Sequence, residues 1–265
     1  MSVFREDVLE GKVAFVTGGG SGICKGITKA LMAHGAKAVI TSRKQERLDA
    51  AAKELAEATE SECLGVACDV RQPETVEAAL DRALERFGGV DVVVNGAAGN
   101  FLAPAAQLSY NAFRTVLEID SIGTYTVCRA AFDKHLKANG GTILNISATL
   151  HYGATPLQTH AAAAKAAVDA VTRSLAVEWG RLGIRVNGIA PGPIDGTEGI
   201  SRLAPGKARD AMIAAIPIGR MGEIEEIANV ALFLCTDAAS LIHGETIVAD
   251  GGHWLGGPAM QLLGG

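Results

Sequence analysis

The stretch Val13-Ala-Phe-Val-Thr17, followed directly by Gly18-Gly-Gly-Ser-Gly22-Ile-Cys24, decides how this sequence folds. Its apolar first part predicts a buried strand, and the glycine cluster predicts a tight turn that opens a helix. Glycines there let the backbone approach a pyrophosphate, which the free N–H groups and positive dipole end of the helix would bind. A turn without a ligand is the alternative. The residues expected to bind the nucleotide are Gly18, Gly20, Ser21, Gly22 and Ile23.

The rest of the sequence repeats this unit of an apolar strand followed by a helix. Further strands are expected over residues Ala38–Thr41, Cys63–Val70, Val90–Val94, Thr142–Ile146, Arg185–Ile189 and Glu245–Ala249. Helices are expected over Ile23–His34, Gln45–Thr59, Pro73–Arg86, Phe113–Asn139, Thr159–Leu182 and Glu223–Cys235. Continuous apolar strands alternating with helices indicate a parallel sheet that is covered on both faces. We predict an α/β fold: a single doubly wound Rossmann domain over residues 1–265, with about seven parallel strands.

Composition excludes several classes of function. The 265 residues carry a net charge of -5, so no basic face is expected for nucleic acid or an anionic membrane. The five cysteines lack C-x-x-C spacing, which indicates reduced thiols, and no Cys/His cluster has the spacing of a metal site. The segment Met1–Gly11 lacks the apolar core of a secretory signal, and the apolar stretches are too short to span a membrane.

The residues after the second and third strands indicate which nucleotide binds. The second strand ends in Thr41-Ser42-Arg43-Lys44, where an NAD-binding protein would carry an acidic residue for the ribose 2′-hydroxyl. Cations there favour a 2′-phosphate and hence NADP(H), because Arg43 can bind phosphate through two parallel hydrogen bonds. Asp69 follows the third strand, where its carboxylate is placed to accept from the adenine amine, to cap the next helix, or both.

These motifs together resemble the short-chain dehydrogenase/reductase superfamily. The resemblance rests on Thr17-Gly18-x-x-x-Gly22, Asp69, Asn95-Gly-Ala-Ala-Gly99 and Pro191-Gly192-Pro193, and covers Leu9 to about Trp254. Cys24 replaces the usual third glycine and is expected to tighten the packing of the helix. Besides the glycine turn and Arg43, the resemblance implies cofactor contacts at Asp69, Val70, Asn95, Lys165, Pro191, Gly192, Ile194 and Thr197.

The catalytic residues depart from the superfamily pattern. Lys165 of the Tyr-x-x-x-Lys pair is present, but Ala161 occupies the tyrosine position and Ala148, beside Ser147, the serine position. Asp120 stands where an asparagine is usual. Alanine at the tyrosine position with aspartate at the asparagine position resembles the peroxisomal 2,4-dienoyl-CoA reductases. Segments that agree with this resemblance are 96–104, 160–169 and 190–199.

The resemblance implies NADPH-dependent reduction of 2,4-dienoyl-CoA thioesters to 3-enoyl-CoA in the β-oxidation of unsaturated fatty acids. Hydride would add at the far end of the conjugated system, so no phenol is needed beside the accepting carbon. Lys165 would hold the nicotinamide ribose. Asp120 would donate a proton, directly or through water, or would only orient Lys165 or a water. The alternatives are another enoyl-thioester or carbonyl reductase of the superfamily, and a catalytically silent NADP-binding protein.

The expected partner is a fatty acyl-CoA, whose phosphates require cations. The resemblance points to Arg71 and Arg202 for these phosphates, with Arg43 shared between the cofactor and CoA. Residues 193–216 are expected to form a substrate lid, because they are rich in small residues and follow the end of a strand. Further expected substrate contacts are Asn100 and Phe101 near the thioester and, at the entrance, Ser109 with Asn111.

Three remaining expectations concern the histidines, the assembly and the location. None of His151, His160, His243 and His253 has a recognisable partner at a useful spacing, although His160 adjoins the tyrosine position and is kept as a candidate. The helices over Phe113–Asn139 and after Thr159 are apolar on more than one face, which favours a homodimer or homotetramer over extra burial within one chain. The resemblance implies a peroxisomal location, although the sequence does not end in a Ser-Lys-Leu signal; a cytoplasmic location is the alternative.

Overall fold

The apolar strands form one parallel sheet in the computed structural model, which describes residues 3–197, 199–200 and 206–256. The strand order is β3-β2-β1-β4-β5-β6-β7, and every neighbouring pair is parallel. This confirms the predicted fold class. The strands are β1 (Val13–Thr17), β2 (Lys37–Ser42), β3 (Cys63–Ala67), β4 (Val92–Asn95), β5 (Gly141–Ile146), β6 (Ile184–Pro191) and β7 (Thr246–Ala249).

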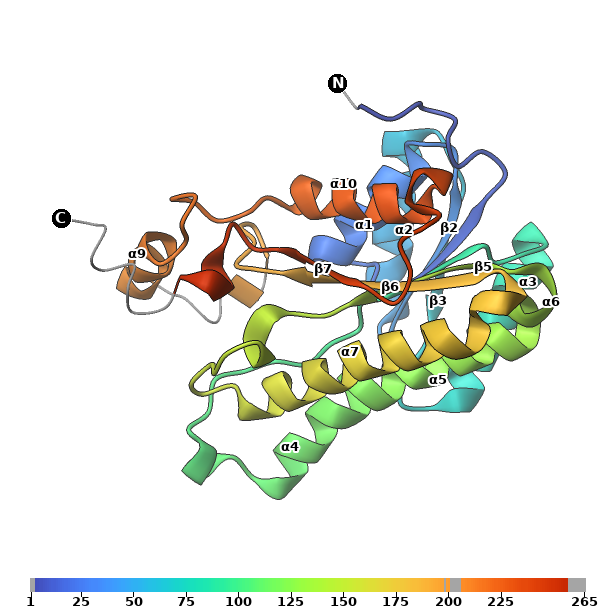
Figure 1. The fold of residues 1–265 in the computed structure, drawn as a ribbon. Helices are drawn as coiled ribbons and strands as arrows, with labels where there is room; N and C mark the ends of the chain where they lie inside the picture. The colour runs from blue at the N-terminus through green and yellow to red at the C-terminus, as the bar shows by residue number, and fades with distance from the viewer. Residues whose placement is uncertain (1–2, 198, 201–205, 257–265) are drawn as a thin grey trace.

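Helices cover both faces of the sheet (Figure 1). One apolar core packs the sheet against α1 (Gly22–Met32), α2 (Gln45–Thr59) and α10 (Ile224–Cys235). A second core packs the opposite face against α3 (Pro73–Phe87), α5 (Gly123–Ala131) and α7 (Thr159–Trp179). The other α-helices among the described residues are α4 (Tyr110–Leu117), α6 (Lys137–Asn139) and α9 (Lys207–Ala214).

Two features of the helices differ from the sequence expectation. The long helix predicted over Phe113–Asn139 is interrupted by two π-helical segments, Glu118–Ile122 and Phe132–Leu136. A π-helical turn has i→i+5 hydrogen bonds in place of the i→i+4 bonds of an α-helix. The spacing of apolar residues in the sequence does not show where such a turn occurs. Helix α9 lies inside the predicted lid region, and its weak amphipathic pattern gave no sign of it.

The strand order places a crevice at the carboxyl ends of β1 and β4. The chain leaves β1 toward β2 on one side and reaches β4 on the other, which makes this pair the topological switch point of the sheet. Thr17 and Asn95 lie side by side as the last paired residues of these two strands. Ligands of open α/β sheets bind in such a crevice, so the fold itself selects where the site lies.

The described residues include neither a membrane-spanning helix nor a cluster of metal ligands. Among them, no helix is long and apolar enough to cross a membrane. Within the same residues, no group of three or more His, Cys, Asp or Glu side chains is placed to hold a metal ion. All five cysteines are free thiols.

Candidate active site

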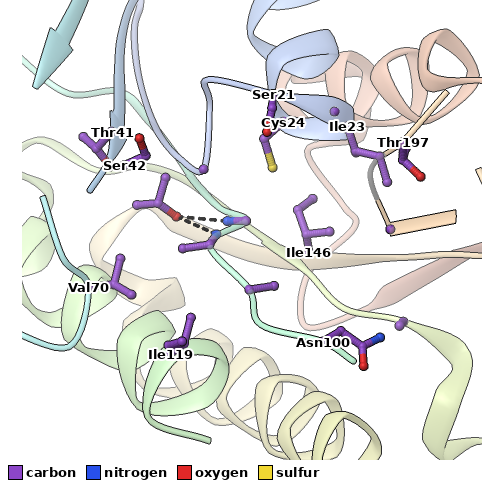
Figure 2. A pocket seen from close by; sticks show the side chains of 18 of the residues that line it. Ser21, Ile23, Cys24, Thr41, Ser42, Val70, Asn100, Ile119, Ile146 and Thr197 are labelled. Atoms are coloured by element: carbon purple, nitrogen blue, oxygen red, sulfur yellow. Dashed lines mark hydrogen bonds between the residues drawn. The ribbon is translucent and has the colours of Figure 1, made fainter. Parts of the chain in front are cut away.

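A cavity of about 560 Å³ opens at the switch point. In Figure 2, Ser21, Ile23 and Cys24 at the start of α1 face Val70 and Ile119 across it, with Ile146 between them. Predicted residues that line the cavity are Gly18, Ser21, Gly22, Ile23, Arg43, Asp69, Val70, Arg71, Asn100, Lys165, Pro191, Gly192 and Thr197. Further lining residues, which the sequence analysis did not assign, include Thr17, Thr41, Ser42, Cys68, Gly96, Ala97, Ala98, Ile119, Ile146, Ser147 and Gly199.

The glycine turn is held tightly against the loop that follows β4. Gly18 has a φ of +70°, and a Cβ added to it would lie 3.0 Å from the carbonyl oxygen of Gly96. The Thr17 Oγ1 accepts hydrogen bonds from the backbone N–H groups of Gly96 at 3.0 Å and Ala97 at 3.2 Å (Figure 2). This backbone cradle at a helix N-terminus fits the pyrophosphate of a dinucleotide.

The side chain of Cys24 explains why residue 96, in the loop after β4, is a glycine. The Cys24 side chain is buried, and a Cβ on Gly96 would come within 2.0 Å of its Sγ atom. The Cys24 sulfur therefore fills the space that the usual third glycine of the turn leaves empty. A side chain at position 96 would clash with this sulfur, which explains the glycine there. Burial raises the pKa of the Cys24 thiol to about 12, so it is a packing group rather than a reactive thiol.

Two arginines and one aspartate form the polar end of the cavity. Arg43 is exposed and makes no ion pair with any residue that the structure describes. Asp69 accepts from the Nε of Arg71 at 2.9 Å and from the Arg71 backbone N–H at 3.1 Å. This contact with Arg71 holds the pKa of Asp69 below its usual range, with a smaller effect from Arg43. Asp69 is therefore a carboxylate at pH 7, and Arg43 is a cation open to an anionic ligand.

Lys165 lines the opposite end of the cavity and forms a buried ion pair with Asp120, which lies behind it and does not itself line the cavity. The Lys165 Nζ donates to the carbonyl oxygen of Ile146 at 2.9 Å and lies 3.2 Å from the Asp120 Oδ2. The other carboxylate oxygen, Oδ1, accepts from the backbone N–H of Gly99 at 2.7 Å. Ala161 lies one helical turn before Lys165 and is buried, so no phenol is present where the superfamily carries one.

Local structure explains how Asp120 reaches this position. Asp120 lies within the π-helical segment Glu118–Ile122, where the Thr124 Oγ1 donates to its carbonyl oxygen at 2.6 Å. Such segments occur often at functional sites, because they shift a side chain out of the regular helical register. Ser147 also lines the cavity; its buried hydroxyl meets no hydrogen-bond partner among the residues described.

Three residues predicted to bind the cofactor do not line the cavity: Gly20, Asn95 and Ile194. The Asn95 Nδ2 instead donates to the Oδ1 of Asn145 at 2.8 Å, in a buried network that joins β4 to β5. Ile194 is buried against Gly222, where an added Cβ would lie 2.6 Å from its Cδ1. Both side chains are used inside the fold, so their predicted contacts with a cofactor would have to come from the backbone.

The predicted substrate residues are only partly brought together. Phe101 and Ser109 do not line the cavity: Phe101 stacks on His160, and the Ser109 Oγ caps α4 by accepting from the Ala112 N–H at 3.1 Å. Arg202 lies outside the described residues.

The expectation that these histidines have no partner is wrong for His151 and for His243. The His151 Nε2 lies 2.9 Å from the Oδ2 of buried Asp169, and the Tyr152 hydroxyl donates to the same oxygen at 3.4 Å. His151 and Asp169 are 18 positions apart and meet because the loop after β5 folds back on α7, which spacing in the sequence does not reveal. The His243 Nε2 lies 2.8 Å from the Ala176 carbonyl oxygen.

A doubly wound parallel sheet with a glycine cradle at its switch point, and a buried lysine beside it, defines a class of dinucleotide-dependent oxidoreductases. The family model described as "Enoyl-(Acyl carrier protein) reductase" matches residues 18–253. The chain belongs to the short-chain dehydrogenase/reductase superfamily, as its motifs indicated.

Individual relatives narrow the comparison. A peroxisomal 2,4-dienoyl-CoA reductase [(3E)-enoyl-CoA-producing] of Danio rerio is 52% identical over 96% of this chain and 85% of its own. A probable 2,4-dienoyl-CoA reductase [(2E)-enoyl-CoA-producing] of Bacillus subtilis is 41% identical over 93% of this chain and 98% of its own. Among solved structures, the citronellol catabolism dehydrogenase of Pseudomonas aeruginosa superposes with a TM-score of 0.85 at 35% identity, covering 96% and 99% of the two chains.

Proposed function

We propose that the protein uses NADPH to reduce 2,4-dienoyl-CoA thioesters to 3-enoyl-CoA during the β-oxidation of unsaturated fatty acids. The observation that carries this proposal is the buried pair of Asp120 and Lys165 beside Ala161, in a site that lacks the phenol of a carbonyl reductase. The names of the Danio rerio and Bacillus subtilis relatives support the substrate class.

The chemistry explains why no phenol is needed. Bound NADPH supplies a hydride to C5, the far end of the conjugated system. The electron pair then moves to the thioester oxygen as a dienolate, and a proton is taken up on C2. The site has to orient the substrate and stabilise this negative charge, and it has no alkoxide to protonate. The ammonium of Lys165 provides positive charge where the dienolate forms, and the same group would hold the ribose hydroxyls of the cofactor.

Asp120 takes part in delivering the proton. Both of its carboxylate oxygens have partners in the structure, one the N–H of Gly99 and the other the ammonium of Lys165. This arrangement matches a group that orients Lys165 and a water better than one that donates its own proton. The proton reaches C2 from water held on Asp120.

The cavity also supports the choice of NADPH. Arg43 is an exposed cation at the carboxyl end of β2, where the 2′-phosphate of the adenosine ribose would lie. The residues at and just after the end of β2, Thr41-Ser42-Arg43-Lys44, include no acidic side chain to recognise the 2′-hydroxyl of NAD. Arg71 borders the same end of the cavity. Its guanidinium is paired with Asp69, so it would have to contact Asp69 and a CoA phosphate at the same time.

The cavity does not bear on the location, the assembly or the lid of the protein. A peroxisomal location is supported by the names of relatives from several eukaryotes. Assembly into a homodimer or homotetramer stays a prediction; a hollow of about 300 Å³ between α5 and α7, bordered by Tyr125 and Trp179, lies on the face expected to pair. That residues 193–216 act as a lid also stays a prediction.

A panel of substrates tests the proposed function. NADPH oxidation is measured with 2,4-hexadienoyl-CoA, 2-hexenoyl-CoA and a simple ketone, and the diene reaction is repeated with NADH. We expect turnover of the diene alone, and faster with NADPH. Turnover of the ketone or the monoene would favour another reductase of the superfamily. NADPH binding without turnover of any substrate would indicate a silent NADP-binding protein.

A further inference from the structure

His160, the second residue of α7, is a buried polar group that the proposed chemistry does not use. Its side chain is fully buried, and neither ring nitrogen makes a hydrogen bond within the described part of the chain. Burial lowers the pKa of His160, opposed by weaker influences from the Phe101 backbone and the charge of Asp120. The ring is therefore neutral at pH 7. A buried ring whose nitrogens have no hydrogen-bond partner contributes to the structure through its packing.

The contact that His160 does make is with Phe101. The two rings are stacked, with centroids 4.2 Å apart and planes inclined by 22°. Phe101 is 38% exposed, so the stack holds a side chain that otherwise reaches toward solvent. A stacked aromatic pair of this kind stabilises a structure beyond the apolar area that it buries.

Phe101 is the last residue of the segment Gly99–Phe101, whose first residue is hydrogen-bonded to Asp120. The N–H of Gly99 donates to the Asp120 carboxylate, Asn100 lines the cavity, and Phe101 packs on His160. His160 and Asp120 therefore hold the two ends of the stretch of backbone that forms this wall of the cavity.

A further anchor fixes the same loop just beyond Phe101. The Ala103 N–H donates to the carbonyl oxygen of Leu157 at 2.9 Å. Leu157 has a φ of +66°, a conformation that non-glycine residues rarely adopt. This hydrogen bond ties the loop after Phe101 to the residues that lead into α7, next to His160.

The reaction has two possible products, which differ in the carbon that takes up the proton. After hydride transfer the dienolate takes a proton from water either at C2, giving the 3-enoyl thioester, or at C4, giving the 2-enoyl thioester. Relatives carry names with either product, (3E)-enoyl-CoA or (2E)-enoyl-CoA, so the fold alone does not fix the carbon.

We propose that His160 is a positioning residue that selects the product: its stack on Phe101 fixes the Gly99–Phe101 segment and so holds C2, rather than C4, at the proton route of Asp120. This role rests on the proposed function. It acts through the ring and not through the unpaired nitrogens, so a phenyl ring should serve equally well.

Product analysis of two variants tests the role. His160→Ala removes the ring, and His160→Phe keeps a ring for the stack while removing the nitrogens. Leu175→Ala is the matched control, since it creates a cavity in the core about four turns further along α7. Each enzyme reduces 2,4-hexadienoyl-CoA with NADPH, and chromatography separates 3-hexenoyl-CoA from 2-hexenoyl-CoA.

We expect wild type, His160→Phe and Leu175→Ala to give 3-hexenoyl-CoA. His160→Ala should give a mixture with at least about one tenth 2-hexenoyl-CoA, and a kcat lower by about tenfold, because a displaced substrate reacts from a poorer geometry. Its Kd for NADPH should stay within about twofold of wild type, since the stack does not border the glycine turn.

Unchanged product from His160→Ala would overturn the proposal, and so would a mixture from His160→Phe, which would assign the role to the nitrogens. If His160→Ala does not fold, Phe101→Leu removes the other ring at a half-exposed position and must give the same mixture. A wild-type enzyme that leaves the diene unreduced would instead contradict the proposed function.

Discussion

Replacing Lys165 with methionine is expected to lower kcat/KM for diene reduction by about a thousandfold, which corresponds to about 4 kcal/mol. Methionine keeps an apolar stem of similar length but removes the ammonium that contacts Asp120 and the Ile146 carbonyl oxygen. The variant loses the charge that stabilises the dienolate and the donor for the cofactor ribose. It also leaves a carboxylate buried without its partner, which costs about 3–5 kcal/mol of folding stability.

Three measurements separate these effects. Steady-state kinetics give kcat/KM, quenching of protein fluorescence gives the Kd for NADPH, and circular dichroism gives the melting temperature. Lys165→Arg is the control, because it keeps the charge but places a wider guanidinium on a side chain that is only 10% exposed. A Lys165→Met enzyme within tenfold of wild-type kcat/KM would show that the ion pair serves only the fold.

Replacing Asp120 with alanine is expected to slow single-turnover reduction by about a hundredfold, the usual scale for losing one group in proton transfer. The loss arises because water near C2 no longer has a carboxylate to orient it, and because Lys165 loses its partner. Rapid-mixing absorbance at the NADPH band measures net hydride transfer, which slows when the dienolate returns its hydride before it is protonated, and a single turnover excludes effects on product release.

The asparagine variant controls for the structural part of this effect. The side-chain amide in Asp120→Asn still offers an oxygen to the Gly99 N–H, but it lacks the negative charge that pairs with Lys165. We expect Asp120→Asn to fold normally and to remain slow. A wild-type single-turnover rate in Asp120→Ala would remove Asp120 from the mechanism.

The fold and the nucleotide end of the cavity follow from local patterns in the sequence. Apolar strands such as Val13–Thr17 can be recognised from the sequence alone, because a strand buried on both faces tolerates few polar residues. The strand ends shift by one to three residues, as at β3, which ends at Ala67 rather than at the predicted Val70. Gly18 and Arg43 were located by their place after a strand, which fixes their position in any sheet of this topology.

Features set by packing between distant segments were not predictable. The pairing of His151 with Asp169 depends on how one loop folds back on a helix. The stack of His160 on Phe101 joins residues 59 positions apart, and the π-helical segment around Asp120 leaves no periodic trace. These are properties of side-chain contacts, and a single sequence reports them only where a motif happens to include both partners.

Conjugate addition of hydride to C5 is tested most directly by one isotope experiment. 2,4-Hexadienoyl-CoA is reduced with NADPH that carries deuterium at the transferred position of C4, and the product is analysed by nuclear magnetic resonance. The account predicts deuterium at C5 and a solvent hydrogen at C2 of 3-hexenoyl-CoA. Deuterium at C3, or at the thioester carbon, would mean that Asp120 and Lys165 serve a different reduction.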